Sequence, residues 1–298
     1  MSPPGARPPV CWYLRVSTSG PPRASVVTIV RGRLDHLRRQ GWGLAVQDEP
    51  RLEWVVVRMG GPDPGPALDG PHPDPVVLHL EVAEDEPLPL AAARNAGIRA
   101  ATAPTVVLLD VDAVPGPTTV RRYAEAAEQT GGVLAGPVSY LPAGVPATPE
   151  DLPSMAGVGT PHAARPVPAE GEMLPDERWE LLWTVSMAAP AELLTAAGGF
   201  DERYTGYGAE DTDMAMRLRA TGAPLHWVGG AWAFHQHHDE VGRRDRVPDI
   251  VRNASLFRSV WGWWPMEGWL RDLAAAGRVE WDPAGTVLRE RRPAAPPR

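Results

Sequence analysis

Lysine is absent from the 298-residue sequence, so arginine supplies every fixed positive side chain. A phosphate-binding site in this protein must therefore use guanidinium groups, which contact phosphate through two parallel hydrogen bonds. The net charge of −8 argues against a general nucleic-acid-binding protein, because such proteins usually carry a basic surface. We therefore expect no nucleic-acid partner.

Cysteine is nearly absent as well, since Cys11 is the only one. A single cysteine excludes an internal disulfide framework and suits a reducing compartment. The sequence also lacks a signal-peptide pattern and any apolar run of about 20 residues, the length that a membrane-spanning helix needs. We therefore expect a cytoplasmic protein with no transmembrane segment.

Strands alternate with helices in the first 140 residues, which predicts an α/β fold with a mainly parallel central sheet flanked by helices. Buried strands are expected at 25–30, 52–57, 75–80 and 105–109, and helices at 34–44, 88–101 and 118–129. Residues 141–177 show no helical or strand period and are expected to form a functional loop. A flexible leader (1–22) and a flexible tail (283–298) are expected around one domain, 23–282.

Asp110 and Asp112 directly follow the most apolar predicted strand. Ligands of parallel sheets bind at the carboxyl ends of the strands, where both carboxylates are expected. Carboxylates spaced in this way can hold Mg²⁺ or Mn²⁺, and these ions stabilise the charge of a leaving diphosphate. The alternative is a surface turn without chemistry, because Asp-x-Asp is common in loops.

A second acidic pair, Glu210 and Asp211, begins a predicted helix, where the helix dipole favours acids. Gly208 before it lets the backbone approach a ligand, and Tyr204 and Tyr207 offer flat faces for a sugar ring. One carboxylate can act as a general base toward a hydroxyl, and position alone does not choose between the two. A helix cap without chemistry is the alternative.

Residues 235–238 read His-Gln-His-His and are dense in metal ligands. Imidazole suits Mn²⁺ or Zn²⁺ better than Mg²⁺, and the first interpretation pairs one of these histidines with Asp112 across a metal site. His235, His237 and Asp239 also match part of the His-x-His-x-Asp-His pattern of metal-dependent hydrolases, although Glu240 stands where the last histidine belongs. A solvated polar loop is the third interpretation.

Tryptophan is concentrated near the C-terminus, at positions 261, 263, 264 and 269. Packing against the sheet is the first interpretation of this cluster. An acceptor platform or a peripheral membrane contact is the second, because tryptophan suits sugar faces and membrane interfaces alike.

Taken in order, these segments resemble the inverting glycosyltransferases of the GT-A fold in the family-two group. The C-terminal half is similar to the β-1,4-galactosyltransferases and the polypeptide N-acetylgalactosaminyltransferases. The resemblance runs from about Val26 to about His238 and is carried by the segments Val30–Leu37, Arg94–Gly97, Leu108–Asp112 and Gly198–Asp213. It implies a Rossmann-like GT-A fold that binds a nucleotide sugar, with a donor-binding half at 23–140 and an acceptor half at 178–282.

The resemblance implies metal-dependent transfer of a sugar from a nucleotide diphosphate donor, with UDP favoured, to an unknown acceptor hydroxyl, using Mn²⁺ or Mg²⁺. It assigns donor binding to Arg31, Arg33, Arg94, Asn95, Asp110, Val111 and Asp112. It assigns the metal to Asp112, Asp110 and His235, with His238 as the second histidine and His237 as the third. The base is expected to be Asp211 with Glu210 beside it, and the sugar contacts Tyr207, Gly208 and Trp183.

The sequence departs from the galactosyltransferases at two positions. If His237 is aligned with their metal-binding histidine, Phe234 stands where they carry a metal-binding methionine, and Thr212 replaces an acid that helps to bind their acceptor. Transfer of galactose to N-acetylglucosamine is therefore not implied. The hydrolase built on the histidines and a catalytically silent nucleotide-sugar-binding module are kept as alternatives.

Overall fold

The computed structural model describes residues 20–145, 147–238 and 245–291. Apart from residues 20–22, the expected leader lies outside these ranges, and Cys11 and Asp239 lie outside them too.

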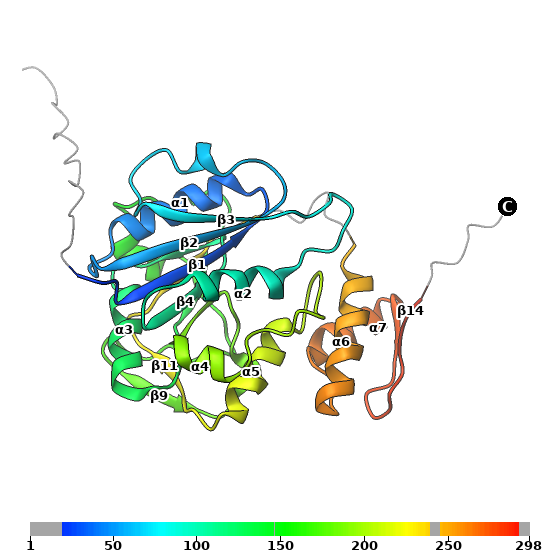
Figure 1. Ribbon diagram of the computed structural model, residues 1–298. Coiled ribbons are helices and arrows are strands. Elements are labelled where there is room, and N and C mark those ends of the chain that lie inside the picture. The colour runs from blue at the N-terminus through cyan, green and yellow to red at the C-terminus, as the bar shows by residue number, and fades with distance from the viewer. Residues whose placement is uncertain (1–19, 146, 239–244, 292–298) are drawn as a thin grey trace, which may run out of the picture.

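An eight-stranded sheet forms the centre of the molecule (Figure 1), in the order β3-β2-β1-β4-β10-β6-β11-β9. Its first half is parallel and consists of β3 (Pro75–Leu80), β2 (Leu52–Met59), β1 (Ala24–Val30) and β4 (Thr105–Leu109). Its second half is mixed and consists of β10 (Ser186–Pro190), β6 (Val133–Ala135), β11 (Leu225–Val228) and β9 (Met173–Asp176). The expected α/β architecture with a mainly parallel sheet is confirmed.

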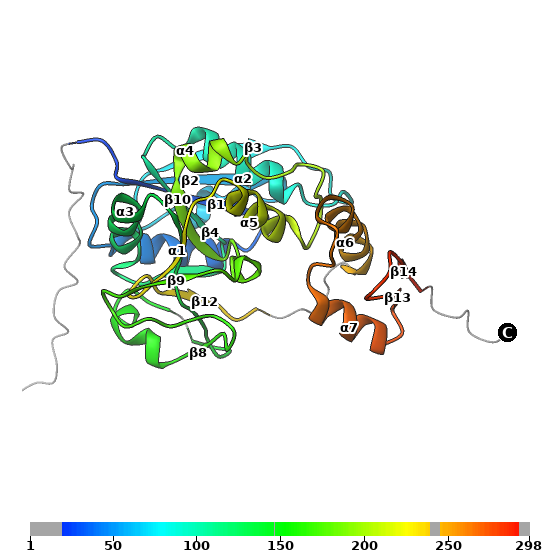
Figure 2. The same ribbon diagram turned by 90° about the horizontal axis from the view of Figure 1, so that it is seen from below.

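Helices cover both faces of this sheet (Figures 1 and 2). One face packs against α1 (Leu34–Ala45) and α3 (Thr119–Thr130), and the other against α2 (Leu90–Ala100), α4 (Ala191–Ala196) and α5 (Glu210–Ala220). In β1, Val27 and Ile29 join the core under α2, whereas Val26 joins the core under α1. Because successive side chains point to opposite faces, a strand covered on both sides is apolar throughout.

A second, four-stranded sheet lies beside the first. It runs in the order β5-β12-β7-β8, with β5 at Ala113–Pro115, β12 at Ala233–His235, β7 at Val138–Tyr140 and β8 at Thr160–Pro161. The pairing of β5 with β12 is antiparallel and sets His235 opposite Ala113. This pairing places the histidine segment, residues 235–238, next to the chain at Asp112, because Ala113 directly follows Asp112.

Residues 141–177 are more ordered than the sequence predicts. They contain β8, β9 and a 3₁₀ turn at Leu152–Gly157, and β9 extends the central sheet by pairing with β11. Leu152 and Met155 are buried in a small cluster with Phe234. The expectation of a structureless connection was wrong here, because elements this short leave no recognisable period among prolines and glycines.

The C-terminal residues pack as a small unit at one side of the sheet (Figure 2). It consists of α6 (Val247–Trp261), α7 (Glu267–Ala275) and the hairpin of β13 (Val279–Trp281) with β14 (Leu288–Glu290). Leu288 is buried in its core, so the hairpin occupies part of the stretch that the sequence assigned to a flexible tail.

The C-terminal tryptophans do not share one surface. Trp264 is buried, and the indole N–H of Trp261 donates to Asp213 over 2.8 Å, whereas Trp263 and Trp269 are exposed. The predicted membrane-contact patch therefore gains no support. Among the helices of the described ranges, none has the length and apolar character needed to cross a membrane.

Candidate functional site

The acidic motif leaves the sheet at the end of β4, where the topology favours a ligand site. Gln40 of α1 holds it there: its buried side-chain amide donates to the carbonyls of Asp110 and Ala113, each over 2.9 Å. The hydroxyl of Thr28 in turn donates to the Gln40 side-chain oxygen over 2.8 Å. A lone glutamine in an amphipathic helix carries no sequence signal, and this support was not predicted.

Asp112 meets two histidines from the far end of the chain. Its Oδ2 atom lies 3.2 Å from Nε2 of His238 and 3.7 Å from Nε2 of His235. Ligand atoms of these three residues all lie within 4.8 Å of one another, which suits one cation. Two imidazoles and one carboxylate favour Mn²⁺ over Mg²⁺.

Asp110 and His237 are not members of this group, although the sequence offered both as metal ligands. Asp110 is instead paired with Arg94, and His237 is exposed. The hydrolase pattern therefore gains no support from the described residues.

The charges around Asp112 favour its ionised form. Burial raises the pKa of Asp112, but the hydrogen bond from His238 and the nearby positive charges, Arg33 among them, hold it well below its usual range. The Arg33 guanidinium donates directly to Asp112. Burial also lowers the pKa of His235, which favours the neutral imidazole that a metal requires.

Arg94 joins the two acidic motifs. Its guanidinium donates to Asp110 over 3.0 Å and to Glu210 over 3.1 Å, and the side chain is buried. The sequence predicted that Arg94 contacts the donor. The structure shows it engaged with protein carboxylates, which fixes the start of α5 against the end of β4.

Glu210 and Asp211 stand in different environments. Glu210 is buried and paired with Arg94, whereas Asp211 is half-buried and accepts a hydrogen bond from the backbone of Thr212 over 2.8 Å. Burial, reinforced by the charge of Glu210, raises the pKa of Asp211 to about 7. Of the two, Asp211 is thus the carboxylate suited to take up and release a proton near neutral pH.

The backbone before this pair is strained. Ala209 has φ 69°, a left-handed conformation that is rare for a residue with a side chain. Gly208 before it has φ 101°, and a Cβ there would meet Met266 Sδ at 3.1 Å. Such strain persists only where the surroundings over-determine it, and it concentrates at functional sites.

The predicted sugar contacts are only partly available. Tyr204 is buried and its hydroxyl donates to Asp213, so it offers no face to a sugar. Tyr207 stacks on Trp269 with ring centroids 5.5 Å apart, and the Arg246 guanidinium lies 4.0 Å from its centroid. Trp183 is half-buried and precedes Val185, whose carbonyl accepts from the Asp110 N–H over 3.4 Å. Trp183 therefore lies close to the acidic motif.

Asn95 has a role other than the predicted donor contact. Its side chain exchanges two hydrogen bonds with the backbone of Phe200, at 2.8 and 2.9 Å, and donates a third to Glu202. These bonds anchor the loop that leads to Asp211. The side-chain amide of Asn95 is therefore hydrogen-bonded to the protein rather than directed at a donor.

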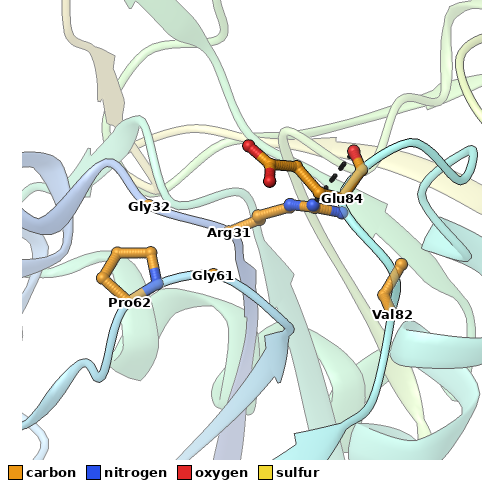
Figure 3. A pocket seen from close by; sticks show the side chains of 6 residues that line it. All are labelled: Arg31, Gly32, Gly61, Pro62, Val82 and Glu84. Atoms are coloured by element: carbon orange, nitrogen blue, oxygen red, sulfur yellow. Dashed lines mark hydrogen bonds between the residues drawn. The ribbon is translucent and has the colours of Figure 1, made fainter.

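Arg31 lines a pocket at the carboxyl ends of β1, β2 and β3 (Figure 3). The pocket measures about 420 Å³ and is lined by Arg31, Gly32, Gly61, Pro62, Val82 and Glu84. Arg31 donates to the carbonyls of Ala83 and Glu84 over 3.3 Å. The sequence predicted Arg31 but none of the residues that follow β2 and β3.

Two family models match the chain, and together they span this site. The model described as glycosyl transferase family 2 matches residues 78–162, which include Asp110 and Asp112. The model described as the N-terminal domain of galactosyltransferase matches residues 175–239, which include Asp211, His235 and His238.

Curated relatives carry related names. Validoxylamine A glucosyltransferase of Streptomyces hygroscopicus subsp. jinggangensis is 28% identical over 270 residues, covering 81% of this chain and 61% of the relative. Hyaluronan synthase of Pasteurella multocida is 28% identical over 210 residues, covering 57% of this chain and 21% of the relative. The chain thus spans at most about three fifths of either relative.

A solved structure shares the fold. Residues 1–349 of TarS from S. aureus superpose with a TM-score of 0.56 at 17% identity, covering 80% of this chain and 64% of that chain.

Proposed function

We propose that this chain, which is a glycosyltransferase of the family-two type with the GT-A fold, transfers a sugar from a UDP-sugar to an acceptor hydroxyl with inversion and with the help of Mn²⁺. The observation that carries the proposal is the bridge made by Arg94. Arg94 pairs with Asp110 and with Glu210, and so joins the segment that carries Asp112 of the candidate metal group to the segment that carries Asp211, whose pKa is close to neutral.

The donor is proposed to lie across the carboxyl ends of the strands. The pocket around Arg31 and Glu84 suits the base and ribose, and Arg33 suits a phosphate oxygen. A divalent cation held by Asp112, His235 and His238 would neutralise charge on the departing diphosphate.

Asp211 is proposed as the general base. Its carboxylate takes the proton from the acceptor hydroxyl while that oxygen bonds to the anomeric carbon. The bond from the anomeric carbon to the phosphate oxygen breaks, and the nucleoside diphosphate leaves with the electron pair. Attack from the face opposite the leaving group inverts the configuration. Glu210 and Arg94 orient the base, and positioning supplies much of the acceleration.

Ligand binding and donor turnover test the proposal without a known acceptor. UDP and GDP are compared for thermal stabilisation with and without Mn²⁺, followed by hydrolysis of UDP-sugars to UDP. Asp112→Ala is expected to abolish Mn²⁺-dependent stabilisation by UDP. Asp211→Asn is expected to keep this stabilisation and to lose turnover by about a hundredfold or more.

Glu192→Gln serves as the matched control, because this carboxylate is exposed on α4, away from the site. Wild-type turnover in Asp211→Asn would contradict the assignment of the base. Failure of every nucleotide to bind in a Mn²⁺-dependent way would contradict the function itself.

A further inference from the structure

Arg165 is a buried cation that the proposed reaction does not yet use. It follows β8 within the segment 141–177, and its side chain is 4% exposed. Two backbone hydrogen bonds fix this stretch: the His162 N–H donates to Val138 over 3.3 Å, and the Arg165 N–H donates to His162 over 3.0 Å. The guanidinium therefore lies on an anchored piece of backbone.

The Arg165 guanidinium lacks an acceptor. Within the described ranges, none of its three side-chain nitrogens has a hydrogen-bond partner, and all three are buried. The carbon of the guanidinium stands 4.8 Å from the ring centroid of Trp227 and 5.2 Å from that of Trp183. These cation–π contacts offset part of the cost of burial but satisfy no N–H group. Burial also lowers the pKa of Arg165 to about 10. Such a group is a site for an anion.

The strand order indicates which part of a donor comes near Arg165. The Arg31 pocket lies at β1, β2 and β3, and the metal-binding group lies at the end of β4. The next strands are β10, which Trp183 precedes, and β11, which carries Trp227. A nucleotide sugar laid along this order puts its base in the pocket, its diphosphate at Asp112 and its sugar toward Arg165.

The diphosphate already has Arg33 and the metal-binding group, so the anion at Arg165 belongs to the sugar. We propose that Arg165 binds a carboxylate on the transferred sugar and that the donor is a nucleotide diphosphate of a uronic acid. This inference rests on the proposed function. A planar guanidinium matches a carboxylate through two parallel hydrogen bonds. Trp183 covers the guanidinium with a half-buried ring, and the proposal requires this ring to move aside as the carboxylate enters.

The test compares UDP-glucuronic acid with UDP-glucose in the presence of Mn²⁺ and without acceptor. Wild-type protein is expected to bind and hydrolyse the uronic acid donor about ten- to hundredfold better, the worth of a hydrogen bond to a charged group. Equal or better use of UDP-glucose overturns the proposal, while the proposed function stands. Failure of both donors and of UDP itself overturns the proposed function.

Variants of Arg165 test whether this residue causes the preference for UDP-glucuronic acid over UDP-glucose. Arg165→Met keeps an apolar side chain between the two tryptophans. In this variant the affinity for UDP-glucuronic acid is expected to fall to about that for UDP-glucose, while the affinity for UDP-glucose is unchanged. Arg165→Lys keeps the charge and is expected to retain part of the preference. Arg219→Met, an exposed arginine at the end of α5, is the control and should change neither donor.

An equal loss for both donors in Arg165→Met means that Arg165 only packs the loop, and this overturns the proposal. If Arg165→Met does not fold, the wild-type comparison of the two donors alone decides. A preference for acidic acceptors without any preference among donors also overturns it, since the carboxylate would then come from the acceptor.

Discussion

The side-chain amide of Gln40 donates to the main-chain carbonyl of Asp110 over 2.9 Å. Through Gln40, the buried hydroxyl of Thr28 in β1 supports the backbone of the acidic motif. The first strand, the first helix and the end of β4 therefore share one hydrogen-bonded chain. The carboxylate of Asp112 lies near the two histidines only while the backbone from Asp110 to Ala113 keeps this conformation.

Gln40→Leu is expected to loosen the acidic motif. The carbonyls of Asp110 and Ala113 lose their donor, which costs about 1–3 kcal/mol of the free energy of unfolding for each carbonyl left buried. Urea unfolding measures this cost, and Mn²⁺ titration of UDP binding measures the effect on the metal site. Thr28→Val is the comparison: it removes the outer link of the same chain but leaves both carbonyls with their donor, so it should weaken Mn²⁺ binding less than Gln40→Leu does. Equal Mn²⁺ affinity in both variants would show that Gln40 does not position the motif.

The parts of the fold with strong local signals were predictable. β4 is an unbroken apolar run that ends directly at Asp110, so both the strand and the place of its acids could be read from the sequence. The insertion of β10 between β4 and β6 could not, because antiparallel pairing of residues this distant leaves no local pattern.

Within the candidate site, the sequence predicted residue types better than their partners. Glu210 and Asp211 differ in their surroundings because Arg94 pairs with Glu210, and Arg94 lies 116 residues before Glu210 in the chain. Arg165 was missed because a single arginine in a loop rich in proline and alanine looks solvated, and only the packing of Trp183 and Trp227 buries it. Long-range contacts of this kind are set by the folded chain as a whole.

The pH dependence of turnover should follow Asp211. A base with a pKa of about 7 is ionised in about a tenth of the molecules at pH 6, so kcat/KM for the donor should fall about tenfold there from its plateau above pH 8. The profile should have a slope of one on its acid side. A flat profile between pH 5.5 and 8 would contradict the assignment of Asp211 as the base.

Stability should respond to pH in the opposite sense. The pKa of Asp211 is raised by folding from about 4 to about 7, so its contribution to stability is present below about pH 4 and is lost as the pH rises through 7. Asp211→Asn cannot ionise and should therefore raise Tm relative to wild type at pH 8 but much less at pH 4. Thermal melts at the two values measure the difference, with Glu192→Gln as the control. An Asn variant that is less stable at pH 8 would contradict the raised pKa.

The histidines of residues 235–238 should differ sharply in their effect on metal binding. His238→Ala removes the imidazole nitrogen 3.2 Å from Asp112 and is expected to weaken Mn²⁺ at least about tenfold. His237→Ala changes an exposed side chain that is not part of the cluster of Asp112, His235 and His238, and it is the matched control. Calorimetric titration of Mn²⁺ in the presence of UDP gives both affinities. A larger loss in the His237 variant would reverse the assignment.

Asn95→Ala should lower the stability of the protein without weakening the binding of UDP. The change removes three hydrogen bonds to Phe200 and Glu202, each worth about 1 kcal/mol, so the free energy of unfolding should fall by about 3 kcal/mol. UDP affinity should stay within about twofold, because the Asn95 amide faces the loop before Asp211 rather than the Arg31 pocket. Arg31→Gln provides the contrast: its side chain lines the pocket, so UDP binding should weaken with little change in stability. If Asn95→Ala instead lost UDP binding at full stability, its amide would contact the donor after all.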